Sequence, residues 1–568
     1  MIMDRTYPLG SEAFALAAET YRGPRERGQK REQLVDAVAA TAPSEAFSSG
    51  LRAALLSVLS GGTPGAWGEQ HALAGLGQEA RIDLLLILFE RFDAPLMIRL
   101  PTSRKLPLDE RLLAQGFNRQ SLDVFAQEFW RSRSPQVDSS RRQPFPHQTD
   151  LLSEGAFSVL HPMTGEQVSS SLALPVTRQN GQVFLFYHFA GPEPFFVSVD
   201  PIYGELVSVF MPERNLELTG KLHRHIPWDI ACLKALMVEF GADTARQLAS
   251  REQRRLTLLY GSFNHIGHAM LNEYDACHQC ARRGLFEKVE ALLIGEAAFI
   301  APVSLFPELA GKPQLSGRNL IEVYRQVVEG GLTLVRPTSG SFWFSLDLRE
   351  RFRRVAGGVT PSPALLRARQ CEKLIWLEIR TNDRLWVGQV AGIAALIRAL
   401  QHDIPGLGVV LAGWSRPDGA GEGVFDQIMI GRDHSATLSI LSLLDSHESI
   451  FDITGVTTSE KVAWSFKIDA YAIAYSSGIV FPACIGGHPG VVHSNRYFQE
   501  KLLTRPENGT LQYLENCPQI HFVAPNLITE VEPNGNGNRN YDLNWQDIYT
   551  PLKDFLRLAP LVKCIPPA

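Results

Sequence analysis

From about residue 227 onward, apolar runs of strand length alternate with segments whose apolar residues recur at helical spacing. The clearest run covers residues 374–380 and reads Leu-Ile-Trp-Leu-Glu-Ile-Arg, and a helical pattern follows it over residues 387–400. Strands that alternate with helices pair in parallel, because each helix carries the chain back across one face of the sheet. The alternation therefore predicts an α/β fold with parallel sheets that are covered by helices.

The alternation falls into two successive series of similar size, which predicts two Rossmann-like domains that face each other across a cleft. Before them, apolar residues recur at helical spacing up to about residue 135, and short alternating runs after residue 151 predict an antiparallel meander. We expect a helical accessory domain at residues 1–135. The meander and the first Rossmann-like domain follow at residues 151–355, and the second, with a C-terminal helix, at residues 364–568.

Composition limits the classes of function. The chain has 568 residues, a net charge of −5 and a pI near 6.3, so it lacks the basic excess of a nucleic-acid binder. Its seven cysteines are an odd and sparse set, which argues against a disulfide scaffold and for reduced thiols. The first ten residues lack the apolar core of a signal peptide, and no run reaches the ~18 apolar residues of a membrane span. We expect a cytoplasmic protein with at most peripheral contact with the inner face of a membrane.

The strongest candidate for a catalytic site is the stretch 261–275, Gly-Ser-Phe-Asn-His-Ile-Gly-His-Ala-Met-Leu-Asn-Glu-Tyr-Asp, which follows an apolar run of strand length. At ~100° per residue, four polar side chains share one face of the helix that this stretch predicts; they are His265, His268, Asn272 and Asp275. Asn264 lies in the turn before them. An imidazole accepts a proton near neutral pH without large tuning, so this face suits a general base. The alternative interpretation is a capped helix whose polar groups are satisfied locally.

A zinc site is the other interpretation of this helix, because Cys277 and Cys280 follow His265 and His268. Helical spacing turns the two cysteines roughly 80–180° away from the two histidines, so the four side chains cannot converge on one ion. We expect no bound metal.

Ligands of open α/β sheets bind outside the carboxyl ends of the strands. In the second series the polar or small residues at those ends are Arg380, Trp414, Ser415, Thr458, Glu460, Lys461, Ser476, Ser477 and Gly478. The turn after residue 475 is neither a Walker loop nor a Gly-x-Gly-x-x-Gly motif. Three structural alternatives stay open: a plain turn at Ser476, a capped helix with an exposed Lys461, and an ion pair for Arg380.

Three segments resemble the GT-B glycosyltransferases and, loosely, bacterial family-61-like transferases. They are Asn-His-x-x-His-x-x-x-Asn-Glu at residues 264–273, the strand at residues 375–380, and Asp-Ala-Tyr-Ala-Ile-Ala-Tyr-Ser-Ser-Gly at residues 469–478. The resemblance implies an enzyme of bacterial polysaccharide or glycoconjugate biosynthesis. Such an enzyme moves a sugar from a nucleotide-sugar, held mainly by the C-terminal domain, to a glycan, lipid-linked or protein acceptor.

The resemblance also implies roles for single residues. His265 or His268 is the base, and Arg380, Lys461 and the helix start after Ser477 stabilise the leaving diphosphate. It implies neither a metal nor a cofactor. Two alternatives remain: a sugar-nucleotide epimerase or hydrolase of the same fold, and a binding or scaffold protein without catalytic activity.

Overall fold

The computed structural model describes most of the chain, and the structural statements below refer to these residues: 44–60, 78–100, 110–131, 145–177, 183–200, 204–220, 226–250, 252–263, 265–295, 297–317, 319–339, 344–419, 424–504, 518–531 and 539–558. They form a mixed α/β protein with three main sheets, two of them wholly parallel.

The larger parallel sheet lies in the C-terminal half. Its strands are β13 (Lys373–Glu378), β14 (Leu407–Ala412), β15 (Ile450–Asp452), β16 (Ala470–Ala474), β17 (Gly490–His493) and β18 (Ile520–Phe522). They lie in the order β15-β14-β13-β16-β17-β18, which is the doubly wound order 3-2-1-4-5-6. The direction of winding reverses between β13 and β16, so the crevice that binds ligands in such sheets opens at the carboxyl ends of these two strands.

The smaller parallel sheet precedes it in the chain. Its strands are β9 (Arg255–Tyr260), β10 (Ala291–Gly295), β11 (Gln314–Gly317) and β12 (Leu332–Val335). Their order is β11-β10-β9-β12, so the winding reverses between β9 and β12. The predicted α/β alternation is therefore confirmed in both halves. Strands β11 and β18 were not expected, because each is short and half-exposed and lacks the apolar run of a buried strand.

The third sheet contains four strands of the predicted meander, β4 (Leu172–Thr177), β5 (Val183–Phe189), β6 (Phe195–Val199) and β7 (Leu206–Met211), followed by β8 (Leu216–Thr219), which was not expected. Each pairs antiparallel with the next. Strand β1 (Leu96–Arg99) adds to the edge, parallel to β8. The region expected to be wholly helical therefore also contains a strand. The pattern of β1 did not reveal it, because its partner comes about 120 residues later. The first run of the predicted meander, at residues 156–160, instead pairs with β3 (Gln167–Ser170) in a separate hairpin.

The N-terminal helices are α3 (Ser44–Leu59), α5 (Gln78–Phe92), α6 (Glu110–Ala114) and α7 (Arg119–Arg131). The helix expected over residues 108–130 is divided into α6 and α7, because Gly116 turns the chain with a φ of 88°. The helices expected at residues 11–21 and 31–40 lie outside the described residues. The division of the chain into three domains stays a prediction.

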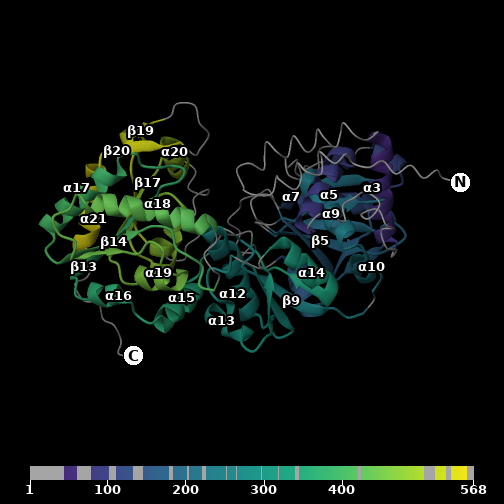
Figure 1. Cartoon of the computed structure of the whole chain (residues 1–568), viewed down its shortest axis with the longest axis horizontal. Coiled ribbons are helices and arrows are strands. Elements are labelled where there is room, and N and C mark those ends of the chain that lie inside the picture. Colours follow the sequence, from purple (N-terminus) through teal and green to yellow (C-terminus); the bar gives the residue numbers. More distant parts are fainter. Residues whose placement is uncertain are drawn as a thin grey trace.

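The apolar core joins these layers. One cluster of buried residues runs from Leu55 and Phe89 in the N-terminal helices, through the antiparallel sheet and the smaller parallel sheet, to Trp376 on β13. A second cluster, which includes Ile375 of β13, covers the opposite face of the larger parallel sheet. Side chains alternate along a strand, so successive residues of β13 serve opposite faces. Figure 1 shows the N-terminal helices at one end, the larger parallel sheet at the other, and α12 (Tyr274–Arg282) and α13 (Pro302–Leu305) between them.

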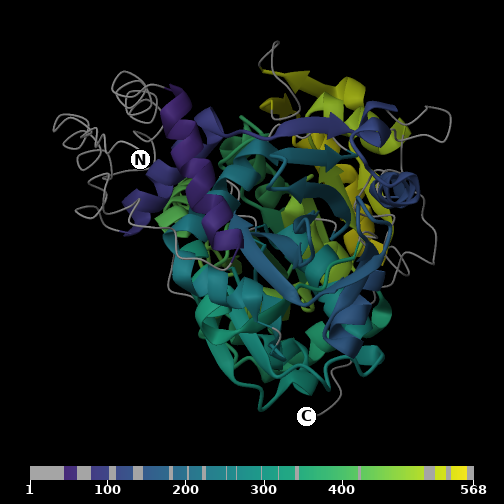
Figure 2. The same ribbon diagram turned by 90° about the vertical axis from the view of Figure 1, so that its right-hand side faces the viewer.

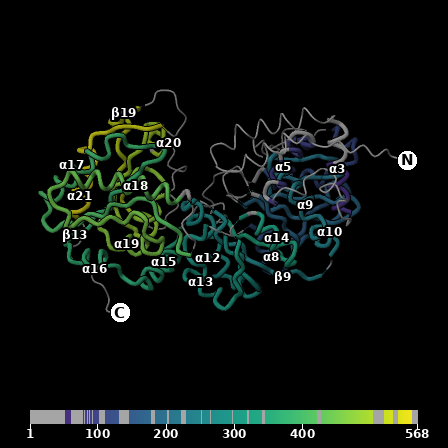
Figure 3. Tube along the Cα trace, in the orientation of Figure 1, coloured from purple at the N-terminus to yellow at the C-terminus, as the bar shows by residue number. Residues whose placement is uncertain are grey.

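Helices cover both faces of the larger parallel sheet. The second cluster includes residues of α17 (Gln389–Asp403), α18 (Val424–Leu441) and α21 (Gln546–Leu558), and the first includes residues of α15 (Leu346–Gly358) and α19 (Thr458–Ser465). Figure 2 turns the molecule so that the N-terminal helices face the viewer, and Figure 3 shows the same arrangement as a Cα tube. No described helix is both long and apolar enough to span a membrane.

The remaining elements connect these layers. They are α8 (Pro146–Glu154), β2 (Phe157–Leu160), β3 (Gln167–Ser170), α9 (Ile226–Glu239), α10 (Gly241–Ala249), α13 (Pro302–Leu305), η5 (Pro307–Leu309), α14 (Leu320–Gly330), α16 (Pro363–Ala368), α20 (Arg496–Thr504), η10 (Pro525–Leu527), β19 (Ile528–Glu530) and β20 (Tyr541–Leu543). Helix α9 packs along α5, which attaches the N-terminal helices to the sheets.

Candidate functional site

The helix after β9 is interrupted by a π-helical turn. It consists of α11 (Ile266–His268), the π segment η4 (Ala269–Glu273) and α12 (Tyr274–Arg282). Short π segments within α-helices are frequent at functional sites. The turn is held by Glu273, whose Oε1 accepts the backbone N–H of Gly261 at 3.0 Å. Asn264 lies outside the described residues.

His268 is held in one tautomer by Asn272. The Asn272 amide donates through Nδ2 to the carbonyl oxygen of Ser339 at 2.7 Å, so its Oδ1 is the atom that faces His268 Nδ1 at 3.0 Å. An amide oxygen only accepts, so Nδ1 carries the proton and Nε2 carries the lone pair. Burial lowers the pKa of His268, while Asn272 and Asp200 oppose the shift. The ring is therefore neutral near pH 7 and able to accept a proton at Nε2.

Asn272 and Asp275 hold the loop that follows β12. Both side chains are fully buried, and both contact Ser339: its carbonyl accepts from Asn272, and its hydroxyl donates to Asp275 Oδ2 at 2.9 Å. The two residues share a side of the helix, as the spacing predicted. Their partners favour support of the site over contact with a substrate.

His265 stands in front of His268, with ring centres 5.0 Å apart. Its side chain is exposed to solvent on one side. The surrounding protein still removes much of the hydration of the ring; this burial, then His268, and then the positive charges of Arg384 and Arg380 lower the pKa of His265 to about 4. These arginines follow β13 of the other parallel sheet, so the two sheets contribute to one electrostatic environment.

The contact between the two sheets is made by α11 and the 3₁₀ turn η6 (Ser477–Val480), which follows β16. A Cβ atom placed on Gly267 would lie 3.1 Å from Cβ of Ser477, so the two backbones approach each other closely. The carboxyl end of β9 thus meets that of β16, and each of these strands borders the point where its own sheet reverses winding. The structure therefore brings α11, which begins after His265 and ends at His268, against the turn that contains Ser477.

Two arginines and one carboxylate occupy the loop after β13. Arg380 donates to Asp383 Oδ1 and to the Asp383 carbonyl oxygen, each at 2.6 Å. Arg384 has a left-handed backbone with a φ of 57°, donates to the Tyr475 carbonyl oxygen at 3.1 Å and stacks 4.9 Å above the Phe498 ring. Strained backbone of this kind often marks functional sites. The structural ion pair considered for Arg380 is present, and one guanidinium charge in the loop is left in excess.

The turn after β16 is held by a buried carboxyl that sequence reasoning missed. Ser476 Oγ donates to Glu378 Oε1 at 2.8 Å and accepts the backbone N–H of Gly478 at 3.0 Å. A Cβ on Gly478 would lie 2.2 Å from Glu378 Oε1, so a larger residue there would displace the Glu378 carboxyl. Burial raises the pKa of Glu378 above its usual range. The sequence feature that could have indicated Glu378 is its position as an acidic residue at the end of an otherwise apolar strand.

Lys461 is a buried residue and not the exposed lysine of the alternative interpretation. Its ammonium donates to the Gly413 carbonyl oxygen at 2.5 Å and lies 4.9 Å from the centre of the Phe481 ring. Burial lowers the pKa of Lys461, and the negative charges of Glu378 and Asp433 oppose that shift. In this position the Lys461 ammonium is suited to balance buried negative charge beneath the strand ends. The predicted contact of Lys461 with a phosphate stays a prediction.

The remaining candidates follow β14 and β15, on the side of β13 away from β16. The backbone N–H of Trp414 donates to Asp433 at 2.8 Å, and its indole N–H donates to Asp426 at 2.7 Å. Ser415 is buried next to it. Helix α19 is capped by Thr457, which accepts the backbone N–H of Glu460 at 3.2 Å. Thr458 instead donates its hydroxyl to the Arg416 carbonyl oxygen at 2.9 Å.

Asp433 is a second residue that sequence reasoning missed. It lies on α18, where its carboxylate accepts from the Trp414 backbone and from the Thr381 hydroxyl. It thereby joins the loops after β13 and β14. No sequence signal distinguishes it from the other polar residues of its helix.

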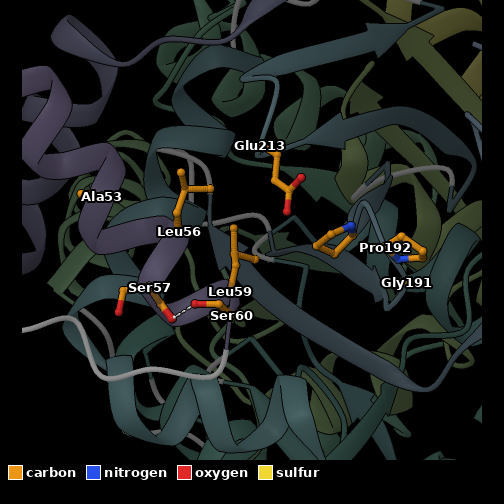
Figure 4. Close-up of a pocket in the computed structure, with 9 residues that line it drawn as sticks. Ala53, Leu56, Ser57, Leu59, Ser60, Gly191, Pro192 and Glu213 are labelled. Carbon is orange, nitrogen blue, oxygen red and sulfur yellow. Dashed lines mark hydrogen bonds between the residues drawn. The ribbon is translucent and has the colours of Figure 1, made fainter. Parts of the chain in front are cut away.

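A hollow of about 780 Å³ lies elsewhere, in the N-terminal part of the protein. Figure 4 shows α3 on one side of it and the loop with Gly191 and Pro192 on the other. It contains none of the predicted site residues. Its lining consists of Ala53, Leu56, Ser57, Leu59, Ser60, Gly191, Pro192, Pro194 and Glu213.

Cys277 and Cys280 are both fully buried on α12. Among the described residues, no group of three or more histidines, cysteines, aspartates or glutamates is placed to hold a metal ion.

Comparisons with known proteins place the chain only loosely. No protein-family model matches the chain, and no curated protein matches it. A putative UDP-N-acetylglucosamine 2-epimerase from Listeria monocytogenes is similar in structure, with a TM-score of 0.24 and 12% identity over 53% of this chain and 66% of that one. The S. aureus protein MnaA, solved with UDP, has a TM-score of 0.24 and 13% identity over 55% of this chain and 69% of that one. At such TM-scores, neither likeness bears on what this chain binds.

Proposed function

We propose that this chain is a glycosyltransferase that moves a sugar from a nucleotide-sugar to an acceptor hydroxyl on a glycan, a lipid-linked molecule or a protein. In this proposal the two doubly wound sheets form two Rossmann-like domains whose carboxyl strand ends face one active site. The observation that carries the proposal is the contact between α11 and η6. That contact sets two neutral imidazoles beside the loop that contains Arg380 and Arg384.

The larger parallel sheet is the donor side. A nucleotide-sugar has a diphosphate that becomes a better leaving group when positive charge lies next to it. The excess guanidinium charge between Arg380 and Arg384 lies where this sheet reverses its winding, which is where such sheets bind nucleotides. Arginine also suits phosphate because its donors form a planar fork.

The smaller parallel sheet is the acceptor side, with His268 as the general base. Its Nε2 is the basic atom because Asn272 holds the proton on Nδ1. An acceptor hydroxyl that donates to Nε2 loses its proton as its oxygen attacks the anomeric carbon of the sugar. His265, whose pKa lies near 4, is the weaker base of the two.

The test is a panel of UDP-glucose, UDP-N-acetylglucosamine and GDP-mannose, each incubated with and without mixed glycan and lipid-linked acceptors. Release of nucleoside diphosphate that requires an acceptor supports the transferase. Release without an acceptor instead indicates a hydrolase, and conversion of the sugar without release indicates an epimerase. The absence of any binding indicates a binding or scaffold protein that does not use nucleotide-sugars.

His268→Ala tests the assignment of the base. We expect turnover to fall by about a hundredfold to ten-thousandfold, which is the contribution of a positioned general base, while donor affinity stays unchanged. His521→Ala is the matched control, because His521 is an exposed histidine on β18. Wild-type turnover in His268→Ala would show that another group is the base.

A further inference from the structure

Glu378 combines three properties that set it apart from the other acids of the site. Its Oε1 accepts from Ser476, which in turn orients the backbone N–H of Gly478. Its other oxygen, Oε2, is buried and has no hydrogen-bond partner among the residues that the structure describes. It also ends β13, one of the two strands that border the winding reversal.

An unpaired buried oxygen is tolerated far better in a neutral carboxyl than in a carboxylate, because desolvation penalises charge most. A proton on Oε2 leaves the Ser476 contact intact, since that hydroxyl donates to Oε1 in either state. A diphosphate bound at the same strand ends adds negative charge nearby and favours the neutral carboxyl further.

We propose that Glu378 is a positioning residue of the donor site that carries a proton on Oε2 while a diphosphate is bound, so that donor binding takes up a proton from solvent. This inference rests on the proposed function, which places the donor diphosphate between β13 and β16. Ionisation of Glu378 at higher pH then places a negative charge next to the diphosphate and weakens its binding.

Charged and titratable groups face Glu378 from four elements besides its own strand. They are Arg380 and Arg384 on the loop after β13, Lys461 on α19, Asp433 on α18 and Tyr541 on β20. Burial raises the pKa of Glu378, and Arg380, Ser476 and Lys461 lower it in part. The folded pKa therefore lies above that of a free glutamate, and affinity is highest below it and falls as pH rises through it.

The histidines do not share this titration. Burial already lowers the pKa of both His265 and His268, so they are neutral throughout the range from about pH 7 to pH 9. Two groups compete with Glu378: the lowered pKa of Lys461 lets it lose charge as pH rises, and burial raises the pKa of Glu273 to about 7. Glu378→Gln removes only the titration of Glu378, so it distinguishes proton uptake by Glu378 from uptake by a competing group.

The experiment measures binding of UDP-glucose, UDP-N-acetylglucosamine and GDP-mannose by calorimetry between about pH 7 and pH 9, in buffers of different ionisation enthalpy. The diphosphate of these donors is esterified at both ends, so it does not titrate in this range. In wild type we expect uptake that approaches one proton per donor at the upper end, and a Kd that rises about tenfold per pH unit.

Glu378→Gln keeps the shape and the acceptor for Ser476 but cannot ionise. We expect this variant to bind with the affinity that wild type has at low pH, with no proton uptake and no pH dependence. Glu372→Gln is the matched control, because Glu372 is an exposed acid next to the opposite end of β13, and it should behave as wild type.

Two results overturn the inference: binding by wild type without proton uptake, and proton uptake that persists in Glu378→Gln, which assigns the proton to another group such as Lys461 or Glu273. Binding by wild type without proton uptake needs no variant to be interpreted, so that result overturns the inference even if Glu378→Gln fails to fold. If wild type binds none of the three donors, the proposed function itself fails, and that outcome is distinct from binding without a proton.

Discussion

At the scale of single residues, the proposed base depends on one buried amide. Asn272 presents Oδ1 to His268 because its Nδ2 is already committed to the Ser339 carbonyl oxygen. A hydrogen bond to one ring nitrogen decides which nitrogen of the imidazole carries the proton. The chain thus sets the basic atom of His268 without changing the residue itself.

Asn272→Ala removes the hydrogen bond that fixes the tautomer of His268. We expect kcat to fall by about a hundredfold, because the ring loses both its tautomer and its orientation, while donor Kd stays near the wild-type value. Loss of the buried hydrogen bonds also lowers the free energy of unfolding by about 1–3 kcal/mol. Steady-state kinetics and urea unfolding measure the two effects separately.

Asn215→Ala controls for that loss of stability. Asn215 donates to the Asp93 carboxylate at 3.0 Å in the N-terminal part of the protein, away from the predicted site. A similar loss of stability with an unchanged kcat is expected there. If Asn272→Ala turned over as fast as Asn215→Ala, the amide would have no role in catalysis.

At the scale of elements, the site depends on two short segments that meet at a glycine. Helix α11 has three residues and η6 has four, and their closest approach is Gly267 against Ser477. Neither segment would be stable alone, because the few hydrogen bonds of so short a helix do not offset the unfavourable free energy of helix nucleation. Each is held by its neighbours, α11 by the π turn that follows it and η6 by the Glu378 and Ser476 contacts.

Gly267→Ala tests this approach. The added Cβ would lie 3.1 Å from Ser477 and 3.2 Å from the His265 ring, so α11 must shift by a few tenths of an ångström. We expect kcat/KM to fall by about tenfold, because a 1 Å displacement of reacting groups costs about a hundredfold. Donor Kd should change little, since Arg380 and Arg384 are not displaced.

Gly431→Ala is the matched helical control. A Cβ on Gly431 meets nothing within 4 Å, so this variant should gain a few tenths of a kcal/mol in stability from helix propensity and keep full activity. Full activity in both variants would mean that the α11–η6 contact does not set the geometry of the site.

At the scale of the whole molecule, the N-terminal helices are part of one core with the sheets. Lys234 on α9 joins them by a buried ion pair with Asp93, at 2.6 Å, and by a hydrogen bond to Asn215 at 2.8 Å. Both charged side chains are almost fully buried. A buried charge that loses its partner destabilises a protein strongly, because nothing replaces its hydration.

Lys234→Ala should therefore lower the free energy of unfolding by about 3–5 kcal/mol, read as a lower urea midpoint. Arg246→Ala is the control, since Arg246 pairs with Asp243 at the surface, and it should cost less than about 1 kcal/mol. Nucleotide-sugar binding at the native state should be unchanged in both. Equal midpoints for the two variants would contradict a continuous core.

The sequence by itself determined the secondary structure of the α/β half and the set of polar residues at its strand ends. The apolar run of strand length before residue 261 forms β9, because a buried parallel strand is rich in apolar residues. His265, His268 and Ser477 were singled out because they follow such runs. These features are local, and the spacing of apolar residues along the chain predicts local structure directly.

Only the tertiary structure decided which strand ends lie side by side and which charges are buried. The pairing of β1 with β8, the order that places β13 beside β16, and the burial of Glu378 and Lys461 all depend on segments separated by many residues in the chain. The identity of a charged residue does not reveal whether its side chain faces water or another segment of the chain. The packing therefore determines the partner and the pKa of such a residue. It also determines whether a lysine lies at the surface or serves as a buried countercharge beneath the site.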